Sequence, residues 1–385
     1  MRAGQRSDRM VAFDYLRTFG VMLVVLHHTI LAYSNFGFLN PYDPMATYSP
    51  VVDGEKSIVF DLLVRLNDSF MMPLLFLVSG LFVWSGLQRR GTRQYLFTRL
   101  KRLGIPFLFG VLIVPVAFYP TMLEIDLVFG IEKSFGAFYF DFIRGGFSQA
   151  GPLWFVWVLF AFDVLAATAY AISRSSGSPD SKRSRPLVDR PGLFAVALFT
   201  LSVAAYIPMI KAVDVSRWAG VGPFKVQISR LFLYLVYFVA GVAMGARGLG
   251  RSAFRKDGPV AKYWWVWGFL SLAAVFAIAF PFMTIWTLPL EPYVVLAETV
   301  LVVMALVAVF LRFVRKSAPV FSSLNANGFG IYIVHYAVVI WLQYAILRVE
   351  LNAWLKAAVV FIGGITICWC LVAATRRISA VRRII

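Results

Sequence analysis

The sequence predicts an all-α, polytopic integral membrane protein with about ten transmembrane helices and both termini in the cytoplasm. Hydrophobic residues make up 60% of the 385-residue chain, charged residues only 15%, and the mean hydropathy is +0.76. A soluble domain is closer to half apolar and a quarter charged. The apolar runs are also as long as membrane spans, and the basic residues gather in alternate connections.

The apolar runs define the spans, since roughly 20 residues cross the hydrocarbon core of a bilayer. The second run is long, which suggests that it is broken or tilted. The first run is as long as a span and has no small-residue cleavage site, so we expect no signal peptide. We expect one membrane domain over 1–385, with a mobile cytoplasmic loop near 174–191. The predicted helices cover 11–33, 57–86, 103–123, 152–173, 192–210, 228–247, 263–286, 293–312, 328–348 and 353–375.

The net charge of +18 follows this topology. Most of the 37 lysines and arginines lie at the two termini and in the even-numbered connections, whereas the odd-numbered connections carry most of the acidic residues. An excess of lysine and arginine marks cytoplasmic loops. The distribution therefore places both termini inside, indicates a bacterial inner membrane protein, and argues against nucleic-acid binding. The connections 34–56 and 124–151 are long and face outward, and we interpret them as lids over an extracytoplasmic site.

Ionisable residues inside predicted spans are functional candidates, because they are costly in hydrocarbon. The two cysteines, Cys368 and Cys370, indicate no metal site, because no histidine lies near them and a Cys-x-Cys pair alone is a weak signal. We therefore expect no metal and no permanently bound cofactor. The candidates are Asp14, Arg17, His27, His28, Asp61, Arg65, Asn67, Asp68, Asp163, Glu298 and His335.

The first helix carries the strongest candidates. Asp14 and Arg17 are three residues apart near its cytoplasmic end, where they form either an interfacial ion pair or part of a ligand site. His27 and His28 lie in its outer part. Arg17 and His28 are eleven residues apart, close to three helical turns, so they share a face that His27 does not. This favours His28 as a general base, although histidines hydrogen-bonded to carbonyls are an equal alternative.

The second helix carries Asp61, Arg65 and Asp68 in one stripe at about the depth of His28. A carboxylate of this stripe, Asp68 or Asp61, is a candidate to orient the imidazole and stabilise its protonated form. The alternative is an internal ion pair between Arg65 and one of the aspartates. His335 lies two turns into the predicted helix 328–348, at the depth of Arg17. Its structural alternative is a core histidine that bridges two helices. The basic run that starts at Arg99 fits phosphate binding or topology alone.

Four segments resemble the acyltransferase-3 family of membrane O-acyltransferases, in particular its glucan succinyltransferase branch. The first helix has the Arg-x10-His pattern of that family in Arg17 and His28, and the third begins with its Arg-x-x-Arg pattern in Arg99 and Arg102. Asn67 to Phe82 in the second helix form another matching segment. The remaining matches are Gly151-Pro152-Leu153-Trp154-Phe155 and Ile331-Tyr332-Ile333-Val334-His335-Tyr336.

The resemblance implies transfer of an acyl group from cytoplasmic acyl-CoA to a hydroxyl of an extracytoplasmic glycan or lipid-linked sugar. It implies that His28 is the catalytic histidine and that Arg17, Arg99 and Arg102 bind the donor. We add His335 to this donor site and Asp68 to the catalytic group. The predicted substrate-binding residues are Asp14, Asp61, Arg65, Asn67 and Trp154.

Several alternatives stay open at this stage. The acyl group is acetyl or succinyl, with Arg65 as a candidate cation for a succinyl carboxylate, and it moves either directly or through an acyl-histidine. The main competing function is a proton-coupled transporter or flippase of a glycan or lipid-linked substrate, since buried His, Asp and Glu also serve proton relays. The absence of an internal repeat argues against a transporter. The sequence does not indicate the oligomeric state.

Overall fold

The computed structural model describes residues 3–44, 47–146, 150–175, 187–250, 252–279 and 290–385. Eight helical segments of this described part are long and apolar enough to cross a membrane. The predicted class, an all-α polytopic membrane protein, is confirmed. Most of the predicted loop 174–191 lies outside the described residues, as does the end of the predicted helix 263–286.

The long helices occupy the places of the predicted spans. α1 is not among the eight apolar segments, and it carries Asp14, Arg17, His27 and His28. α10 is apolar but shorter than the others. The helices are α1 (Ala3–Leu31), α2 (Ile58–Gly80), α4 (Ile105–Phe129), α6 (Trp154–Ser175), α7 (Pro191–Ala212), α8 (Ile228–Arg247), α10 (Trp264–Ala279), α11 (Glu291–Phe313), α12 (Pro319–Ala345) and α13 (Ala353–Thr375).

Shorter elements connect these helices. The predicted helix 57–86 is broken rather than only tilted, because α2 ends at Gly80 and α3 (Val83–Arg99) follows. The basic connection is therefore helical, and a π-helical turn, η1 (Leu100–Gly104), joins it to α4. The other short helices are α5 (Phe135–Arg144), α9 (Pro259–Lys262), α14 (Ser379–Ile384), and the 3-10 turns η2 (Gly151–Leu153) and η3 (Leu187–Asp189).

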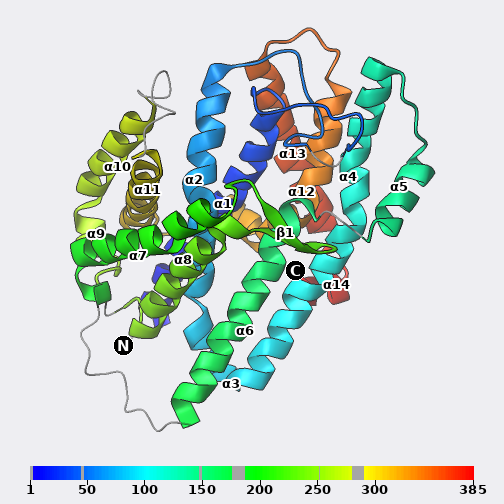
Figure 1. Ribbon diagram of the computed structural model, residues 1–385. Helices are drawn as coiled ribbons and strands as arrows, with labels where there is room; N and C mark the ends of the chain where they lie inside the picture. Colours follow the sequence, from blue (N-terminus) through cyan, green and yellow to red (C-terminus); the bar gives the residue numbers. More distant parts are fainter. Residues whose placement is uncertain (1–2, 45–46, 147–149, 176–186, 251, 280–289) are drawn as a thin grey trace.

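A β-hairpin between α7 and α8 was not predicted, because each strand has only four residues. Strands β1 (Trp218–Val221) and β2 (Phe224–Gln227) pair in antiparallel register, with Trp218 opposite Gln227. The hairpin lies beside the beginning of α6 (Figure 1), where the indole Nε1 of Trp157 donates a hydrogen bond to the Lys225 carbonyl at 3.2 Å. It therefore brings Trp218 close to the residues that begin α6.

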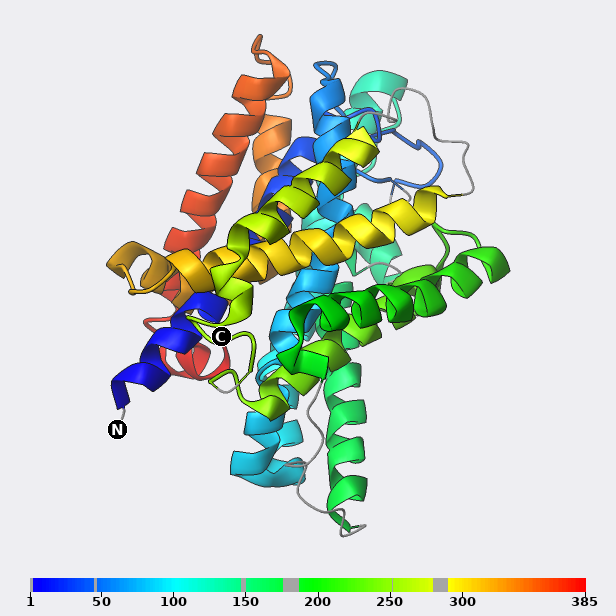
Figure 2. The same cartoon turned by 90° about the vertical axis from the view of Figure 1, so that its left-hand side faces the viewer.

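The packing of α1 sets the position of the site, because this helix contacts α2, α11, α12 and α13. α7 and α11 cross the steeper helices of the bundle at a large inclination (Figure 2). α2 and α8 pack closely through glycines: a Cβ on Gly80 would lie 2.2 Å from the Phe238 carbonyl oxygen, and one on Gly241 would lie 2.0 Å from the Leu77 oxygen. Small residues allow such close approach between membrane helices.

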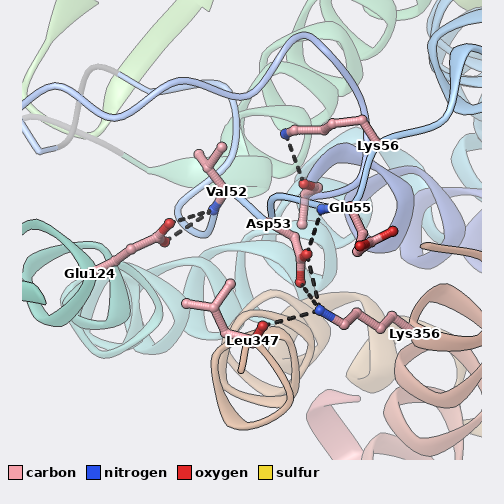
Figure 3. A network of polar contacts seen from close by, with 8 residues as sticks. Val52, Asp53, Glu55, Lys56, Glu124, Leu347 and Lys356 are labelled. Atoms are coloured by element: carbon pink, nitrogen blue, oxygen red, sulfur yellow. Dashed lines mark hydrogen bonds and ion pairs between the residues drawn. The ribbon is translucent and has the colours of Figure 1, made fainter. Parts of the chain in front are cut away.

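The connection 34–56, which is predicted to face outward, is fixed by buried polar contacts (Figure 3). The Lys356 ammonium of α13 lies 2.8 Å from the Asp53 carboxylate, and both side chains are only 3% exposed. The Val52 amide donates to the Glu124 carboxylate of α4 at 3.0 Å, and the Lys56 ammonium donates to the Ser34 carbonyl at 2.8 Å. These contacts tie the connection to α4 and α13. Its role as a lid stays a prediction.

Candidate active site

The first helix aligns its functional face with α12. The Arg17 guanidinium donates a hydrogen bond to Asn325 Oδ1 at 3.0 Å, and the rings of His28 and Tyr336 lie 4.8 Å apart. Both pairs involve residues eleven apart in their own helix, so α1 and α12 run parallel here. Near His28, the Gln343 amide also donates to the His28 and Thr29 carbonyl oxygens, each at 2.9 Å. The predicted common face of Arg17 and His28 is therefore present.

His28 lies among rings. Its imidazole centroid is 5.3 Å from that of His335, in addition to the Tyr336 contact, and the centroid of His27 is 5.5 Å away. His28 therefore faces α12, whereas His27 lies near the charges of Asp68 and Arg230. The two histidines have different surroundings, as the 100° turn between neighbouring helical residues requires.

The depth expected for His335 is wrong. We predicted that it lies level with Arg17, but its ring lies beside His28. The reason is that α12 begins at Pro319, nine residues before the predicted start. The polar run that resembles a connection is helical, and its side chains bind neighbouring helices: Asn325 bonds to Arg17 of α1, and Asn327 accepts from Arg376 at 2.8 Å.

The contacts of His335 fix the position of its proton. Nδ1 lies 2.7 Å from the Tyr332 carbonyl oxygen, and a carbonyl only accepts hydrogen bonds, so Nδ1 carries hydrogen. Nε2 then holds a lone pair. It is buried and has no hydrogen-bond partner in the described part of the chain. His335 therefore presents an unused acceptor next to His28.

Asp68 interacts with His27, the neighbour of His28. Its carboxylate pairs with the Arg230 guanidinium of α8 at 2.6 Å, and this pair interacts electrostatically with His27. The predicted role of Asp68 as the group that orients His28 stays a prediction. Arg230 was not predicted as a site residue, although an arginine in the first turn of an apolar span is itself a signal.

Arg17 interacts electrostatically with Arg99 and Arg102, the other two predicted donor-binding arginines, at the end of the bundle that is predicted to be cytoplasmic. Their guanidinium groups are close enough for electrostatic repulsion at Arg17, which also lies 3.6 Å from Asp14. The Arg99 Nε lies 2.9 Å from the carboxylate of Asp163, whose side chain is fully buried. Tyr95 donates a hydrogen bond to the same carboxylate and accepts one from Arg99 at 3.1 Å. This support fixes Arg99, whereas Arg102 is exposed.

The remaining predicted residues of α2 do not converge on one point. The Asp61 carboxylate accepts from the Asn35 backbone amide at 2.6 Å, so it holds the outward connection. Arg65 pairs with Glu291 at the start of α11. The Asn67 amide donates to the Leu23 carbonyl of α1 at 2.9 Å, and its buried Oδ1 has no described hydrogen-bond partner.

Trp154 stands at the beginning of α6, directly after the turn η2, which contacts α12. Tyr332 donates a hydrogen bond to the Pro152 carbonyl, and a Cβ on Gly151 would lie 3.4 Å from the Tyr336 ring. The φ of +50° at Gly151 favours glycine. The Trp154 ring stacks on Tyr234 of α8, with centroids 5.3 Å apart. Trp154 is therefore part of the aromatic wall between α6 and α8.

The described residues contain no group of three His, Cys, Asp or Glu side chains placed to hold a metal ion. A family model described as an acyltransferase domain matches residues 10–373. No curated protein and no solved structure matches the chain. The family match covers α1 through most of α13, including the arginines and histidines described above. The chain therefore belongs to the acyltransferase-3 family and is a multi-pass membrane acyltransferase.

Proposed function

We propose that this enzyme transfers an acetyl or succinyl group from cytoplasmic acyl-CoA to a hydroxyl of an extracytoplasmic glycan or lipid-linked sugar. We also propose that the enzyme lies in the bacterial inner membrane and functions like the glucan succinyltransferase branch of the family. One observation supports it most strongly: Arg17 and His28 lie on one face of α1. Arg17 forms an arginine cluster with Arg99 and Arg102 at one end, and His28 forms a histidine centre with His335 further along.

The donor end suits the phosphates of CoA. Guanidinium groups bind phosphate with two parallel hydrogen bonds, and their charge is permanent. Eleven helical residues separate Arg17 from His28, which is a rise of about 16 Å. An extended pantetheine arm covers such a distance. Phosphates held at Arg17, Arg99 and Arg102 would therefore place the thioester near His28.

His28 is the base in this proposal. It removes the proton from the acceptor hydroxyl as the oxygen attacks the thioester carbonyl. The carbon–sulfur bond then breaks, and the CoA thiolate leaves with the proton from the imidazolium. In the second route, His28 attacks the thioester carbonyl first and expels the CoA thiolate; the hydroxyl then attacks the acyl-histidine, the carbon–nitrogen bond breaks, and the hydroxyl proton passes to the thiolate. Acyl-enzyme formed without any acceptor would distinguish the second route from the first.

His335 fits the role of the orienting partner of His28. Its Nε2 lone pair can accept an N–H hydrogen bond from the neighbouring imidazole, since the two rings are 5.3 Å apart. Such a bond would leave the other nitrogen of His28 with its lone pair toward the substrate. A neutral imidazole would then take the place that a carboxylate holds in Ser-His-Asp systems.

The test is acyl transfer by the purified protein in liposomes, with labelled acetyl-CoA and succinyl-CoA and a mixed glycan acceptor. Thiol release and label on the glycan are measured for the wild type, His28→Ala and His27→Ala. We expect loss with His28→Ala and retention with His27→Ala. A folded wild-type protein that releases no thiol with either donor would refute the proposed donor, and release without glycan label would refute the acceptor.

A further inference from the structure

A pair of charged side chains at the interface of α2 and α8 is partly exposed. Asp68 is the eleventh of the 23 residues of α2, and its side chain is 43% exposed. Its partner Arg230 is 20% exposed. Charged groups at such depth face water-filled cavities or the bundle interior, because hydrocarbon does not solvate them. The exposed fraction of Asp68 therefore leaves hydrogen-bonding atoms of this pair accessible to a ligand.

Aromatic rings continue this lining. Tyr234 lies one helical turn beyond Arg230, and its ring stacks with those of Phe76 and Trp154, at centroid distances of 5.1 and 5.3 Å. The Trp218 ring of the β-hairpin meets Trp154 edge to face at 6.0 Å. Trp154 is partly exposed and Trp218 is 47% exposed. A charged pair with hydrogen-bonding capacity thus lies beside accessible indole rings.

We infer that Asp68, Arg230, Trp154 and Trp218 bind a neutral hexose unit of the acceptor. The inference rests on the proposed function, because it places the acceptor of that same reaction. A carboxylate accepts hydrogen bonds from hydroxyls and a guanidinium donates to them, so the pair matches two hydroxyls of one sugar. The C–H face of a pyranose packs on an aromatic face as other apolar surfaces do. The opposite charges cancel, which suits a neutral sugar better than an anionic one.

The geometry also links this proposed sugar-binding site to the proposed base, His28. The pair interacts with His27, and the centroid of His27 is 5.5 Å from that of His28. A sugar held at the pair would therefore lie near the histidines and present a hydroxyl toward His28. Asp68 becomes an acceptor-binding residue, and the orienting role passes to His335.

The experiment separates binding from transfer. Short neutral glucan oligosaccharides, linear and cyclic, are titrated into the purified protein by calorimetry, and the KM values for glucan and for acyl-CoA are measured in parallel. The variants are Trp218→Ala and the charge-free double variant Asp68→Asn with Arg230→Gln, which leaves neither charge without its partner. Trp265→Ala is the matched control, because Trp265 is a 59% exposed tryptophan on α10.

We expect each of the two test variants to weaken glucan binding and raise the glucan KM about tenfold or more, with an unchanged KM for acyl-CoA. Wild-type glucan affinity in both variants would overturn the inference, and the proposed function would stand if transfer persisted. If the variants lose glucan binding and the wild-type protein transfers no acyl group, the result supports the sugar-binding site and refutes the proposed function. A wild-type protein that binds no glucan refutes the inference, whereas transfer to any other glycan would leave the proposed function intact.

Discussion

The arginine cluster and the histidine centre lie on the same face of α1, but their surroundings differ. At the end predicted to be cytoplasmic, the predicted phosphate ligand Arg99 is paired with a buried carboxylate, Asp163, and supported by Tyr95. Around His28, the neighbouring groups are the rings of His27, His335 and Tyr336. One region is built from permanent charges and the other from groups that are neutral or able to become so.

The difference follows from what each region is proposed to do. Phosphate groups carry fixed charge, so their ligands need fixed positive charge in a fixed direction, which a carboxylate behind the guanidinium supplies. A general base has to release and take up a proton in each turnover. A carboxylate beside it would stabilise the protonated form, whereas a neutral imidazole orients the ring without adding a charge.

The largest expected effect is at His28. Replacing it by Ala removes the proposed base, and we expect kcat to fall by about 10³-fold with little change in acyl-CoA affinity. His27→Ala is the matched control, because the neighbouring histidine faces the Asp68–Arg230 pair instead of α12. Steady-state kinetics with equilibrium binding of a non-hydrolysable acyl-CoA analogue measures both quantities. An equal loss in the two variants would remove the distinction between the two faces of α1.

The next largest effect on kcat is expected at His335. If its Nε2 orients His28, His335→Ala should lower kcat by about 10- to 100-fold, while the KM for acyl-CoA changes little. His335→Gln keeps an amide acceptor near the position of Nε2 and should recover part of kcat. The kcat and KM of the two variants are compared. A rise in the acyl-CoA KM with unchanged kcat would instead return His335 to the donor site.

The sequence alone predicts the fold class and the shared face of Arg17 and His28, because both depend on local periodicity. Hydropathy identifies apolar runs, and 3.6 residues per turn decide which residues share a face. The same rule separates His28 from His27 without knowledge of any neighbouring helix.

The partners of these residues could not be predicted, because they depend on how helices dock. The segment that begins α12 is rich in Ser and Asn and resembles a loop, yet its side chains are satisfied by Arg17 and Arg376 of other helices. This error placed His335 at the wrong depth. The pairing of Asp68 with Arg230 depends on the glycine contacts between α2 and α8, which no single helix reveals.

Asp163 belongs to the arginine cluster, where we expect an effect on acyl-CoA binding. Asp163→Asn removes the charge behind Arg99, so the guanidinium loses its fixed direction, and we expect the KM for acyl-CoA to rise about tenfold with a smaller change in kcat. Arg93→Ala, an exposed arginine on the same helix, is the control for general loss of positive charge. Initial rates over a range of acyl-CoA concentrations decide the result. A selective fall in kcat would show that Asp163 acts on the chemistry and not on the donor.

The smallest effect on catalysis is expected at the ion pair of Asp53 and Lys356, which lies in neither region. Lys356→Met leaves a carboxylate buried without its partner, so we expect a loss of about 3–5 kcal/mol in the free energy of unfolding, measured by denaturant titration in detergent. Asp53→Asn combined with Lys356→Met removes both charges and should recover much of that loss.

At temperatures where these variants are folded, both KM values should stay near those of the wild type, because the pair ties the connection 34–56 to α13 and touches neither the arginines nor the histidines. A large rise in the glycan KM would instead show that this connection is part of the acceptor site, as its predicted role as a lid requires. In that case three parts of the molecule would control three different quantities. The arginines would set the KM for acyl-CoA, the rings around His28 would set kcat, and the Asp53–Lys356 pair would set the KM for the glycan.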